Sequence, residues 1–259
     1  MTTVRTLVAL PTYNEIENLP GLVDEIFRVL PEADVLVVDD NSPDGTGRWC
    51  DQRAAVEPRI RCLHRAGKLG LGSATNDALR TAIDGGYDLV VTMDADGSHA
   101  PAHLPALIAA TARADVAIGS RYTPGGAIDG WPWYRRLLSR LLNGLSRGLL
   151  RVPVRDTSGA LRVYRVAKLR DVPLARVRSS GYAYLEELLW LLDRAGATFA
   201  EVPITFHARQ AGRSKINLRE VVGKLATLAR LGWRSVGARR AASGRSLPDS
   251  PLDPAAKGD

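Results

Sequence analysis

The hydrophobic pattern of the first half of the chain alternates between short apolar runs and helical stripes. The runs predict buried strands, because they are short and end at turn-forming residues; they occupy residues 4–10, 35–38, 60–64, 89–93 and 116–119. Pro11 is expected to end the first strand, and Asn14 to cap the helix that follows. The apolar stripe of that helix is formed by Ile16, Leu19, Leu22, Val23, Ile26, Phe27 and Leu30.

The order of these elements predicts the fold class. Strands and helices alternate repeatedly, and a further helix is expected over residues 73–83. Such alternation predicts parallel βαβ units, and hence an α/β fold with a Rossmann-like three-layer α/β/α arrangement around a mostly parallel central sheet. Further along the chain, residues 160–164 and 201–206 are expected to form strands, and residues 184–195 a helix.

Carboxylates follow two of the predicted strands. Asp39 and Asp40 come directly after the second strand, and Asp94 and Asp96 follow the fourth. Residues i and i+2 of an extended strand point to one side, and parallel strands end at one edge of a sheet, where open α/β sheets bind ligands. Like charges this close favour a bound cation, and oxygen ligands favour a hard divalent metal. The alternative is an aspartate-rich turn that merely ends a strand and caps the next helix.

The pattern changes after residue 119, and a helix rich in leucine and arginine is predicted over residues 131–151. Its apolar face is formed by Leu137, Leu138, Leu141, Leu142, Leu145, Leu149 and Leu150. Its aromatic and cationic residues are Trp131, Trp133, Tyr134, Arg135, Arg136, Arg140, Arg147 and Arg151. A basic amphipathic helix that begins with aromatic residues and contains no acid is typical of a membrane interface. The alternative is a core helix with a solvated charged face.

Basic residues return near the end of the chain. A basic loop over residues 209–215 is suited to holding an anion, and residues 218–234 predict a second basic amphipathic helix. The residues from 241 onward are rich in Pro, Ser and Asp, which predicts disorder. We therefore expect one α/β domain over residues 1–215, which includes the 131–151 helix, a C-terminal amphipathic helix over 216–240 and a disordered tail over 241–259.

The charge of the chain indicates an anionic partner. The formal net charge is +7 and the pI is about 9.7, which suits nucleic acid, an anionic membrane surface or a phosphorylated substrate. We expect no nucleic acid partner, because the arginines lie on leucine-rich helices and no RNA- or DNA-binding motif is present. The glycine-rich loop over residues 67–72 lacks the order of a P-loop or Rossmann fingerprint, so it is either a flexible basic loop or lies near a diphosphate.

Cysteine usage and hydropathy predict where the protein works. Cys50 and Cys62 form no CxxC motif and no zinc spacing, so a reducing cytosol is expected. The N-terminus shows no signal-peptide pattern, and no apolar run approaches the roughly 20 residues that a membrane-spanning helix needs. The sequence predicts a cytoplasmic protein that lies peripherally on the cytoplasmic face of a membrane without crossing it.

Six short motifs occur in an order that resembles a known family. They are residues 11–15 (PTYNE), 39–46 (DDNSPDGT), 94–96 (DAD), 119–122 (GSRY), 156–159 (DTSG), and Arg209 with Gly212, Ser214 and Lys215. Each motif alone is a weak signal, but the ordered set, over about residues 4–220, resembles the family 2 glycosyltransferases of the GT-A fold. Within that family the chain looks most like the dolichol- or polyprenol-phosphate mannose synthases.

The resemblance implies a role for each matching residue. Asp94 and Asp96 would hold Mg²⁺ or Mn²⁺ against the donor diphosphate and, with Arg121, would form the catalytic centre. The nucleotide would be bound by Pro11, Tyr13, Glu15, Val38, Asp40 and Ala95. The donor diphosphate and the acceptor phosphate would be bound by Ser120, Arg121, Arg209 and Lys215. Many relatives have a Gln as a further metal contact where this chain has Ser98, a shorter and weaker ligand, with or without help from His99.

The resemblance also implies a reaction. Mannose would pass from GDP-mannose to polyprenyl phosphate with inversion, giving polyprenyl phosphate mannose and GDP. No general base is expected, because the acceptor phosphate, with a second pKa of about 6, is already a dianion at neutral pH. The lipid acceptor requires contact with a membrane surface, alone or through a membrane-anchoring partner protein. The alternatives are a related transferase that uses another nucleotide sugar, such as UDP-glucose, or another acceptor, and a non-catalytic nucleotide-binding membrane scaffold.

Overall fold

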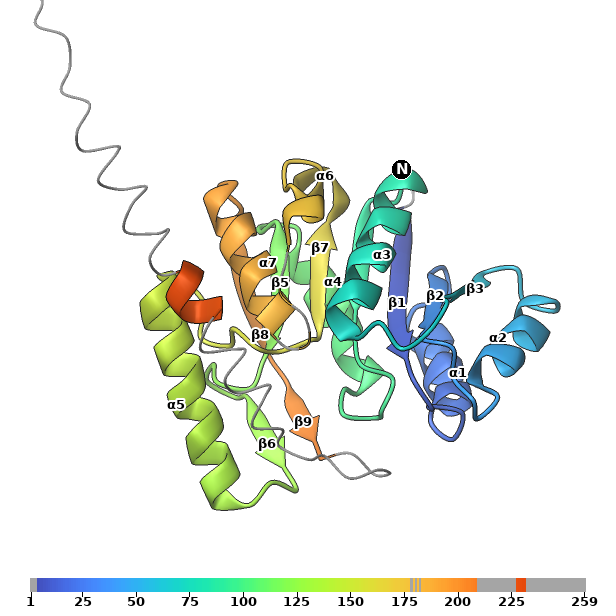
Figure 1. Ribbon diagram of the computed structural model, residues 1–259, viewed down its shortest axis with the longest axis horizontal. Helices are drawn as coiled ribbons and strands as arrows, with labels where there is room; N and C mark the ends of the chain where they lie inside the picture. Colours follow the sequence, from blue (N-terminus) through green and yellow to red (C-terminus); the bar gives the residue numbers. More distant parts are fainter. Residues whose placement is uncertain (1–3, 178, 180, 182, 209–226, 232–259) are drawn as a thin grey trace, which may run out of the picture.

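The centre of the fold is a seven-stranded sheet with the strand order β3-β2-β1-β4-β7-β5-β8 (Figure 1). The structure is a computed structural model that describes residues 4–177, 179, 181, 183–208 and 227–231. The strands are β1 (Thr6–Thr12), β2 (Asp34–Asp39), β3 (Ile60–His64), β4 (Leu89–Thr92), β5 (Val116–Ser120), β7 (Arg162–Arg165) and β8 (Phe199–Pro203). Neighbouring strands are parallel, except that β7 runs antiparallel to β4 and β5. The predicted mostly parallel sheet is confirmed.

Helices cover both faces of this sheet and give the predicted three layers (Figure 1). The helices are α1 (Leu19–Val29), α2 (Thr46–Ala54), α3 (Leu71–Asp84), α4 (Leu104–Ala110), α5 (Trp133–Leu150), α6 (Val166–Leu169) and α7 (Ala183–Arg194). Alternate residues of β1 enter two separate cores: Leu7 packs with α3 and α7, whereas Val8 packs with α1 and α4. The period of two along a strand therefore supplies both faces with apolar side chains.

The first strand continues past the proline that was expected to end it. Pro11 pairs with Val38 of β2, whereas β4 pairs with β1 only as far as Ala9. Met93 N donates to the Ala9 carbonyl, so the backbone polar groups of Ala9 face β4. The backbone nitrogen of Pro11, two residues later, faces the same side, where β4 has already ended, so the N–H that Pro11 lacks is not needed there. Asn14 does not cap the helix, because it has a left-handed φ of 61° and α1 begins only at Leu19.

Two other elements differ from the sequence pattern. The strand predicted over residues 201–206 is divided: β8 ends at Pro203, and β9 (Thr205–His207) pairs with β6 (Ala127–Asp129) in a second, two-stranded sheet. The separating residue Ile204 is buried, and its carbonyl accepts from Ala127 N. Helix α2 was not predicted, because its polar sequence contains only a short buried face around Cys50. The division of β8 from β9 carries the chain from the large sheet to the segment beside the acidic loop 94–98.

The close approach of α3 to α7 predicts a sharp steric effect. A Cβ at Gly72 would lie 2.6 Å from Tyr184 Cβ, whereas a Cβ at Gly21 in α1 meets nothing within 4 Å. We expect Gly72→Ala to lower the free energy of unfolding by about 1–3 kcal/mol through overpacking, and the matched Gly21→Ala to raise it by up to about 1 kcal/mol. Urea unfolding of both variants measures this, and equal stability of the two would contradict the packing described.

Candidate active site

The two acidic strand ends lie at one edge of the sheet, on either side of β1. Asp39 ends β2, and Asp94 follows β4, and both strands pair with β1 in parallel. Asp94 and Asp96 are not on the strand itself, because β4 ends at Thr92 and the chain bends through Gly97, which has a φ of +75°. The expected extended i, i+2 pair is therefore replaced by a turn. Asp96 is buried with an exposure of 3%, and Asp94 is partly exposed.

The segment predicted to hold the metal contains two buried polar atoms without hydrogen-bond partners. Ser98 donates its backbone N–H to Asp96 Oδ1 at 3.0 Å, but its buried Oγ has no partner. His99 Nδ1 is also buried without a hydrogen bond and lies 3.9 Å from Asp94 Oδ2. Burial, opposed by the charge of Asp96, lowers the pKa of His99 to about 4, so its imidazole is neutral at neutral pH. Carboxylates beside unpaired donor atoms fit a divalent cation.

The residues expected to surround the nucleotide lie at the ends of β1 and β2. Pro11 belongs to β1 and Val38 to β2, where they are register partners. The Tyr13 ring lies under Lys68 Nζ at 3.8 Å from its centroid, a cation–π contact. This contact places the glycine-rich loop over residues 67–72 beside Tyr13, one of the residues expected to bind the nucleotide. Glu15 donates its backbone N–H to Thr46 Oγ1.

Asp39 and Asp40 support the loops around them. Asp39 accepts from Thr12 Oγ1 at 3.1 Å and from Ser42 N at 3.0 Å. Asp40 forms a buried ion pair with Arg65 at 2.5 Å and accepts from Gly70 N at 2.8 Å. The carboxylate of Asp40 thus holds the loop that carries Lys68. Sequence analysis missed Arg65, whose only signal was its position directly after β3.

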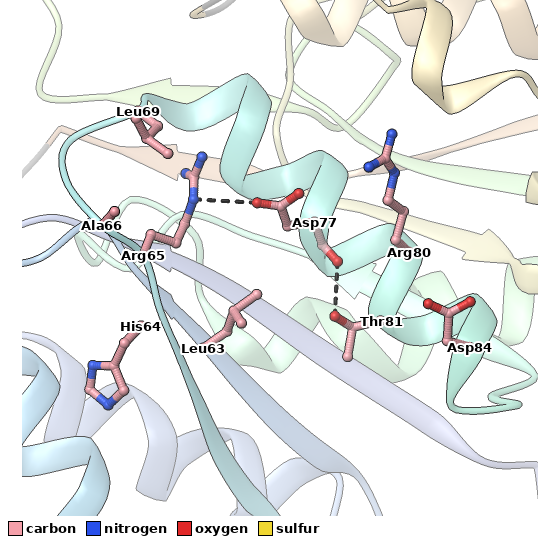
Figure 2. A pocket seen from close by; sticks show the side chains of 9 residues that line it. All are labelled: Leu63, His64, Arg65, Ala66, Leu69, Asp77, Arg80, Thr81 and Asp84. Atoms are coloured by element: carbon pink, nitrogen blue, oxygen red, sulfur yellow. Dashed lines mark hydrogen bonds and ion pairs between the residues drawn. The ribbon is translucent and has the colours of Figure 1, made fainter.

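A pocket of about 410 Å³ opens between β3 and α3 (Figure 2). Its charged lining residues are Arg65, Asp77, Arg80 and Asp84, and none of the predicted site residues lines it. Arg65 in this pocket is already paired with Asp40 and also approaches Asp77 at 3.4 Å. The mixture of both charges does not favour an anionic substrate, so we do not place the reaction here.

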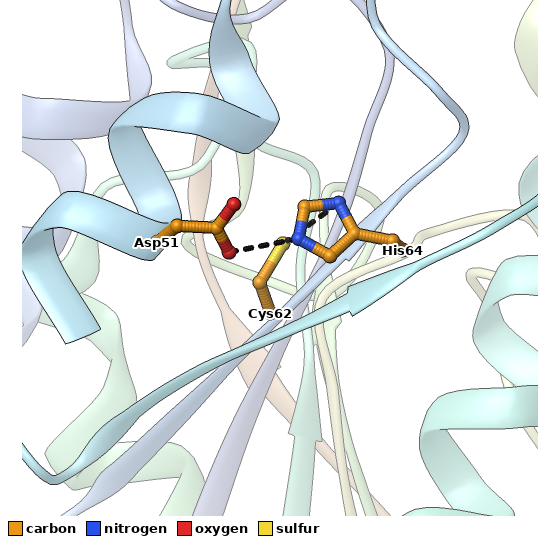
Figure 3. Close-up of side chains that lie close together, drawn as sticks. All are labelled: Asp51, Cys62 and His64. Carbon is orange, nitrogen blue, oxygen red and sulfur yellow. Dashed lines mark hydrogen bonds and ion pairs between the residues drawn. The ribbon is translucent and has the colours of Figure 1, made fainter. Parts of the chain in front are cut away.

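A second group of potential metal-binding side chains lies where α2 meets β3: Asp51, Cys62 and His64 (Figure 3). His64 Nε2 lies 2.8 Å from Asp51 Oδ1, and His64 Nδ1 lies 3.8 Å from Cys62 Sγ. Hydrogen bonding to Asp51 raises the pKa of His64. Because both ring nitrogens have protein partners, this group is satisfied without an ion and joins α2 to the sheet.

Arg121 is bound by a carboxylate, which alters its expected role. Its Nε and Nη2 donate to the two oxygens of Asp156 at 2.7 and 2.8 Å, and Nη2 also donates to Ser158 Oγ. Burial raises the pKa of Asp156, but the charge and hydrogen bonds of Arg121 outweigh it and hold that pKa below its usual value. Arg121 is therefore not a free cation that could hold phosphate by its charge alone, because the carboxylate of Asp156 offsets that charge. Ser120 is fully buried, and its Oγ accepts from Tyr122 N and Thr123 N.

The other predicted phosphate ligands, Arg209 and Lys215, lie outside the described residues, as does most of the second amphipathic helix. Its described part, residues 227–231, is helical, and Leu228 and Leu231 are buried in the core that contains α7. Arg230 approaches Glu187 at 3.3 Å. This part of the predicted helix therefore packs on the domain.

Helix α5 presents most of its leucines to the outside, although Leu150 at its end is buried. The exposed apolar residues are Trp133, Tyr134, Leu137, Leu138, Leu141, Leu145 and Leu149. Its inner face is polar: Asn143 Oδ1 accepts from Thr157 N at 2.9 Å, and Ser146 Oγ donates to Glu186 Oε1 at 2.7 Å. The alternative of a core helix with a solvated charged face is contradicted, because a core helix would bury this leucine face. Within the described residues, no helix has the length and hydropathy to cross a membrane.

The predicted interface residues at the start of α5 form one compact group. The Trp131 ring packs edge to face on Phe206 of β9 at 5.4 Å between centroids, and the Arg135 guanidinium lies over the Trp131 ring at 4.0 Å from its centroid. Arg136 Nε donates to the Trp131 carbonyl. Trp133 is exposed at 74%, and Arg140 is exposed as well. The start of α5 is thus fixed to β9, which also contacts the acidic loop through His99.

Known proteins match both the sequence and the fold. The profile of glycosyl transferase family 2 matches residues 7–172. Polyprenol monophosphomannose synthase of Mycolicibacterium smegmatis is 46% identical over 229 residues, which cover 86% of this chain and 86% of that protein. Undecaprenyl-phosphate mannosyltransferase of Micrococcus luteus is 42% identical over 240 residues, which cover 91% of this chain and 99% of that protein.

Solved structures of glycosyltransferases share the fold. Glucosyl-3-phosphoglycerate synthase from Mycobacterium tuberculosis, in complex with Mn²⁺, UDP and glucosyl-3-phosphoglycerate, has a TM-score of 0.60 at 22% identity and covers 88% of this chain and 77% of that chain. A mannosyltransferase from Pyrobaculum calidifontis, in complex with GDP-Man and Mn²⁺, has a TM-score of 0.54 at 18% identity. The match covers 94% of this chain and 76% of that chain. These likenesses confirm the expected GT-A fold.

Proposed function

Because the chain belongs to glycosyl transferase family 2, we propose that it transfers mannose from GDP-mannose to polyprenyl phosphate, with inversion, giving polyprenyl phosphate mannose and GDP. The observation that carries this proposal is the 46% identity to a polyprenol monophosphomannose synthase over 86% of both chains. At the level of the family, the protein is a glycosyltransferase enzyme. The names of both relatives support mannose as the sugar, and the fold neighbour in complex with GDP-Man supports GDP-mannose as the donor.

The acidic loop supports the donor side of this reaction. Asp94 and Asp96 would hold a divalent metal, with Ser98 and His99 as the nearest further donors. A bound divalent metal offsets the negative charge that grows on the nucleoside diphosphate as it leaves. Tyr13 and the loop of Lys68 would enclose the nucleotide beside it. We therefore propose the donor site at these carboxylates and not at the pocket of Figure 2, which none of them lines.

The acceptor side requires cations but no base. A phosphate acceptor is a dianion at neutral pH, since its second pKa is about 6, so its oxygen attacks the anomeric carbon directly. Two anionic substrates repel each other unless cations lie between them. Asp156 offsets the charge of Arg121, whose N–H groups donate three hydrogen bonds to Asp156 and Ser158. We therefore propose that Arg121 orients phosphate with its remaining N–H groups, whereas Arg209 and Lys215 supply net positive charge.

A donor panel tests the proposal against its nearest alternative. Purified enzyme, undecaprenyl phosphate in detergent and Mn²⁺ are incubated with GDP-mannose, GDP-glucose, UDP-glucose or UDP-galactose at equal concentration. We expect a lipid-extractable sugar from GDP-mannose and at most a few per cent of that amount from the others. Higher transfer from UDP-glucose would establish the related transferase instead. Nucleotide binding without transfer from any donor would favour the non-catalytic scaffold.

The exposed face of α5 supports docking to a membrane surface, where the lipid acceptor lies. We propose a peripheral position on the cytoplasmic face, with α5 as the contact, alone or together with a membrane-anchoring partner protein. Three outward leucines that are each about half exposed, Leu138, Leu141 and Leu145, would each contribute about 1 kcal/mol on insertion. Arginines near an anionic surface add about 1 kcal/mol each.

We expect the triple variant Leu138→Gln, Leu141→Gln, Leu145→Gln to bind vesicles about 100-fold more weakly, since about 3 kcal/mol of apolar contact is removed. Vesicles of equal parts phosphatidylcholine and phosphatidylglycerol in a flotation assay measure this. The free energy of unfolding should change little, because these side chains are exposed in the folded chain. The charge-reversed variant Arg135→Glu, Arg136→Glu, Arg140→Glu should lose binding to anionic vesicles. Equal flotation of wild type and both variants would contradict docking through α5.

A further inference from the structure

The imidazole of His99 lies beside the carboxylates of the acidic loop with one nitrogen that no hydrogen bond uses. Only 2% of the side chain is exposed, and Nδ1 is fully buried without a hydrogen-bond partner. Buried polar atoms are nearly always paired, and an unpaired one calls for an explanation such as an ion at the site. The carboxylate oxygen Oδ2 of Asp94 lies 3.9 Å from Nδ1.

We propose that Nδ1 of His99 is a ligand of the divalent cation held by Asp94 and Asp96, and that this nitrogen makes the site prefer Mn²⁺ to Mg²⁺. The inference deepens the proposed function, on which it rests, by assigning the third protein ligand of the same metal. The separation of 3.9 Å is too long for a hydrogen bond. Two metal–ligand bonds of about 2.1 Å span up to about 4.2 Å, so one ion can contact both atoms.

The position of the His99 ring is set by packing rather than by its nitrogens. The ring meets Phe206 edge to face, with 5.3 Å between centroids, and the backbones of the two residues form an isolated antiparallel bridge. His207 N donates to the Ser98 carbonyl at 3.1 Å and fixes the same segment. Strand β9 therefore orients the ring before any ion binds, and Nδ1 does not have to give up a hydrogen bond in order to coordinate one.

Ser98 is the competing third ligand. Its buried Oγ also lacks a partner, but its backbone N–H is already bound to Asp96 Oδ1, and a neutral hydroxyl is a weak ligand. The two assignments differ in the metal that they favour. Imidazole suits transition metals, whereas Mg²⁺ prefers oxygen ligands in an octahedral arrangement. A nitrogen ligand from His99 thus predicts selection between the two ions, and an oxygen ligand from Ser98 does not.

The test is Mn²⁺ binding in the presence of GDP, followed by electron paramagnetic resonance. In the wild-type protein we expect pulsed spectra of bound Mn²⁺ to show coupling to a ¹⁴N nucleus of imidazole. His99→Gln should abolish this coupling and weaken Mn²⁺ binding at least about tenfold, while Mg²⁺ affinity, measured by competition, should change less than about threefold. The spectral signature is independent of transferase activity and of a general loss of stability.

Two control variants make the assignment specific. Ser98→Ala removes the competing ligand, and His103→Gln removes a histidine that accepts from Thr205 N; both should keep the ¹⁴N coupling. The inference is overturned if wild-type Mn²⁺ shows no nitrogen coupling, or if the coupling survives in His99→Gln. If the wild-type protein retains no Mn²⁺ in the presence of GDP, the proposed function itself is contradicted. If Mn²⁺ binds without nitrogen coupling, only the role of His99 is lost.

Discussion

Replacing Asp96 with asparagine is expected to lower mannose transfer by about 10³-fold or more, because it would remove a charge that we propose holds the cation on the leaving group. Asparagine has nearly the same shape, and its Oδ1 can still accept from Ser98 N, as Asp96 does at 3.0 Å. The loop should therefore keep its conformation. Initial rates with GDP-mannose, polyprenyl phosphate and saturating Mn²⁺ measure the effect.

The control for Asp96→Asn is the same substitution at Asp171. Asp171 is exposed and pairs with Lys168, so Asp171→Asn should transfer mannose at the wild-type rate. The free energy of unfolding of Asp96→Asn should be no lower than that of the wild type, since a buried like charge has been neutralised. Transfer within tenfold of the wild-type rate in Asp96→Asn would contradict the assignment of the acidic loop to the metal.

Asp156→Asn is expected to lower the free energy of unfolding by about 3–5 kcal/mol at pH 7, because it leaves Arg121 as a buried charge without its partner. Asp156 is fully buried, and its two oxygens accept from Nε and Nη2 of Arg121. Its backbone contacts add to this, since Oδ1 accepts from Gly159 N and Oδ2 from Arg121 N. Urea unfolding at pH 7 measures the difference.

The pH dependence of this effect has a definite sign. The pKa of Asp156 in the folded protein lies below its usual value, so its contribution is fully present above the unfolded pKa of about 3.9 and is lost as the pH falls through the folded pKa. The difference in stability between wild type and Asp156→Asn should therefore be largest near neutral pH and shrink below about pH 4. If Asp156→Asn lowers the free energy of unfolding at pH 7 by less than about 1 kcal/mol, as expected for Asp171→Asn, the ion pair of Arg121 and Asp156 contributes little to stability.

The elements that the sequence predicts well are those whose hydrophobic period is set by the core. β3 is predicted residue for residue, and α3 within two residues at its start and one at its end, because their apolar positions face the two cores directly. The sequence also predicts the edge of the sheet at which Asp39 and Asp94 lie on either side of β1. Local sequence determines such features, since the strand period and the βαβ order follow from burial alone.

Features that depend on distant parts of the chain were not predictable. Pro11 remains in a strand because β4 ends early on its open side. Arg121 was expected to bind phosphate, and its pairing with Asp156, thirty-five residues later, has no signal in the local sequence. The pattern of α5 allowed both a membrane-interface helix and a core helix, and the exposure of its leucine face is decided by hydrogen bonds that fix the polar face to Thr157 and Glu186. Each case depends on a tertiary contact that no local period encodes.

The measurement that tests the proposed function most directly is transfer of labelled mannose from GDP-mannose into the organic phase with polyprenyl phosphate as acceptor. The reaction is run with Mn²⁺, with Mg²⁺ and with a chelator, for the wild type and for Asp96→Asn. We predict lipid-linked label from the wild type with a divalent metal, and background label with the chelator or with Asp96→Asn. No lipid-extractable label from the wild type, or transfer that neither the chelator nor Asp96→Asn reduces, would contradict the proposed function.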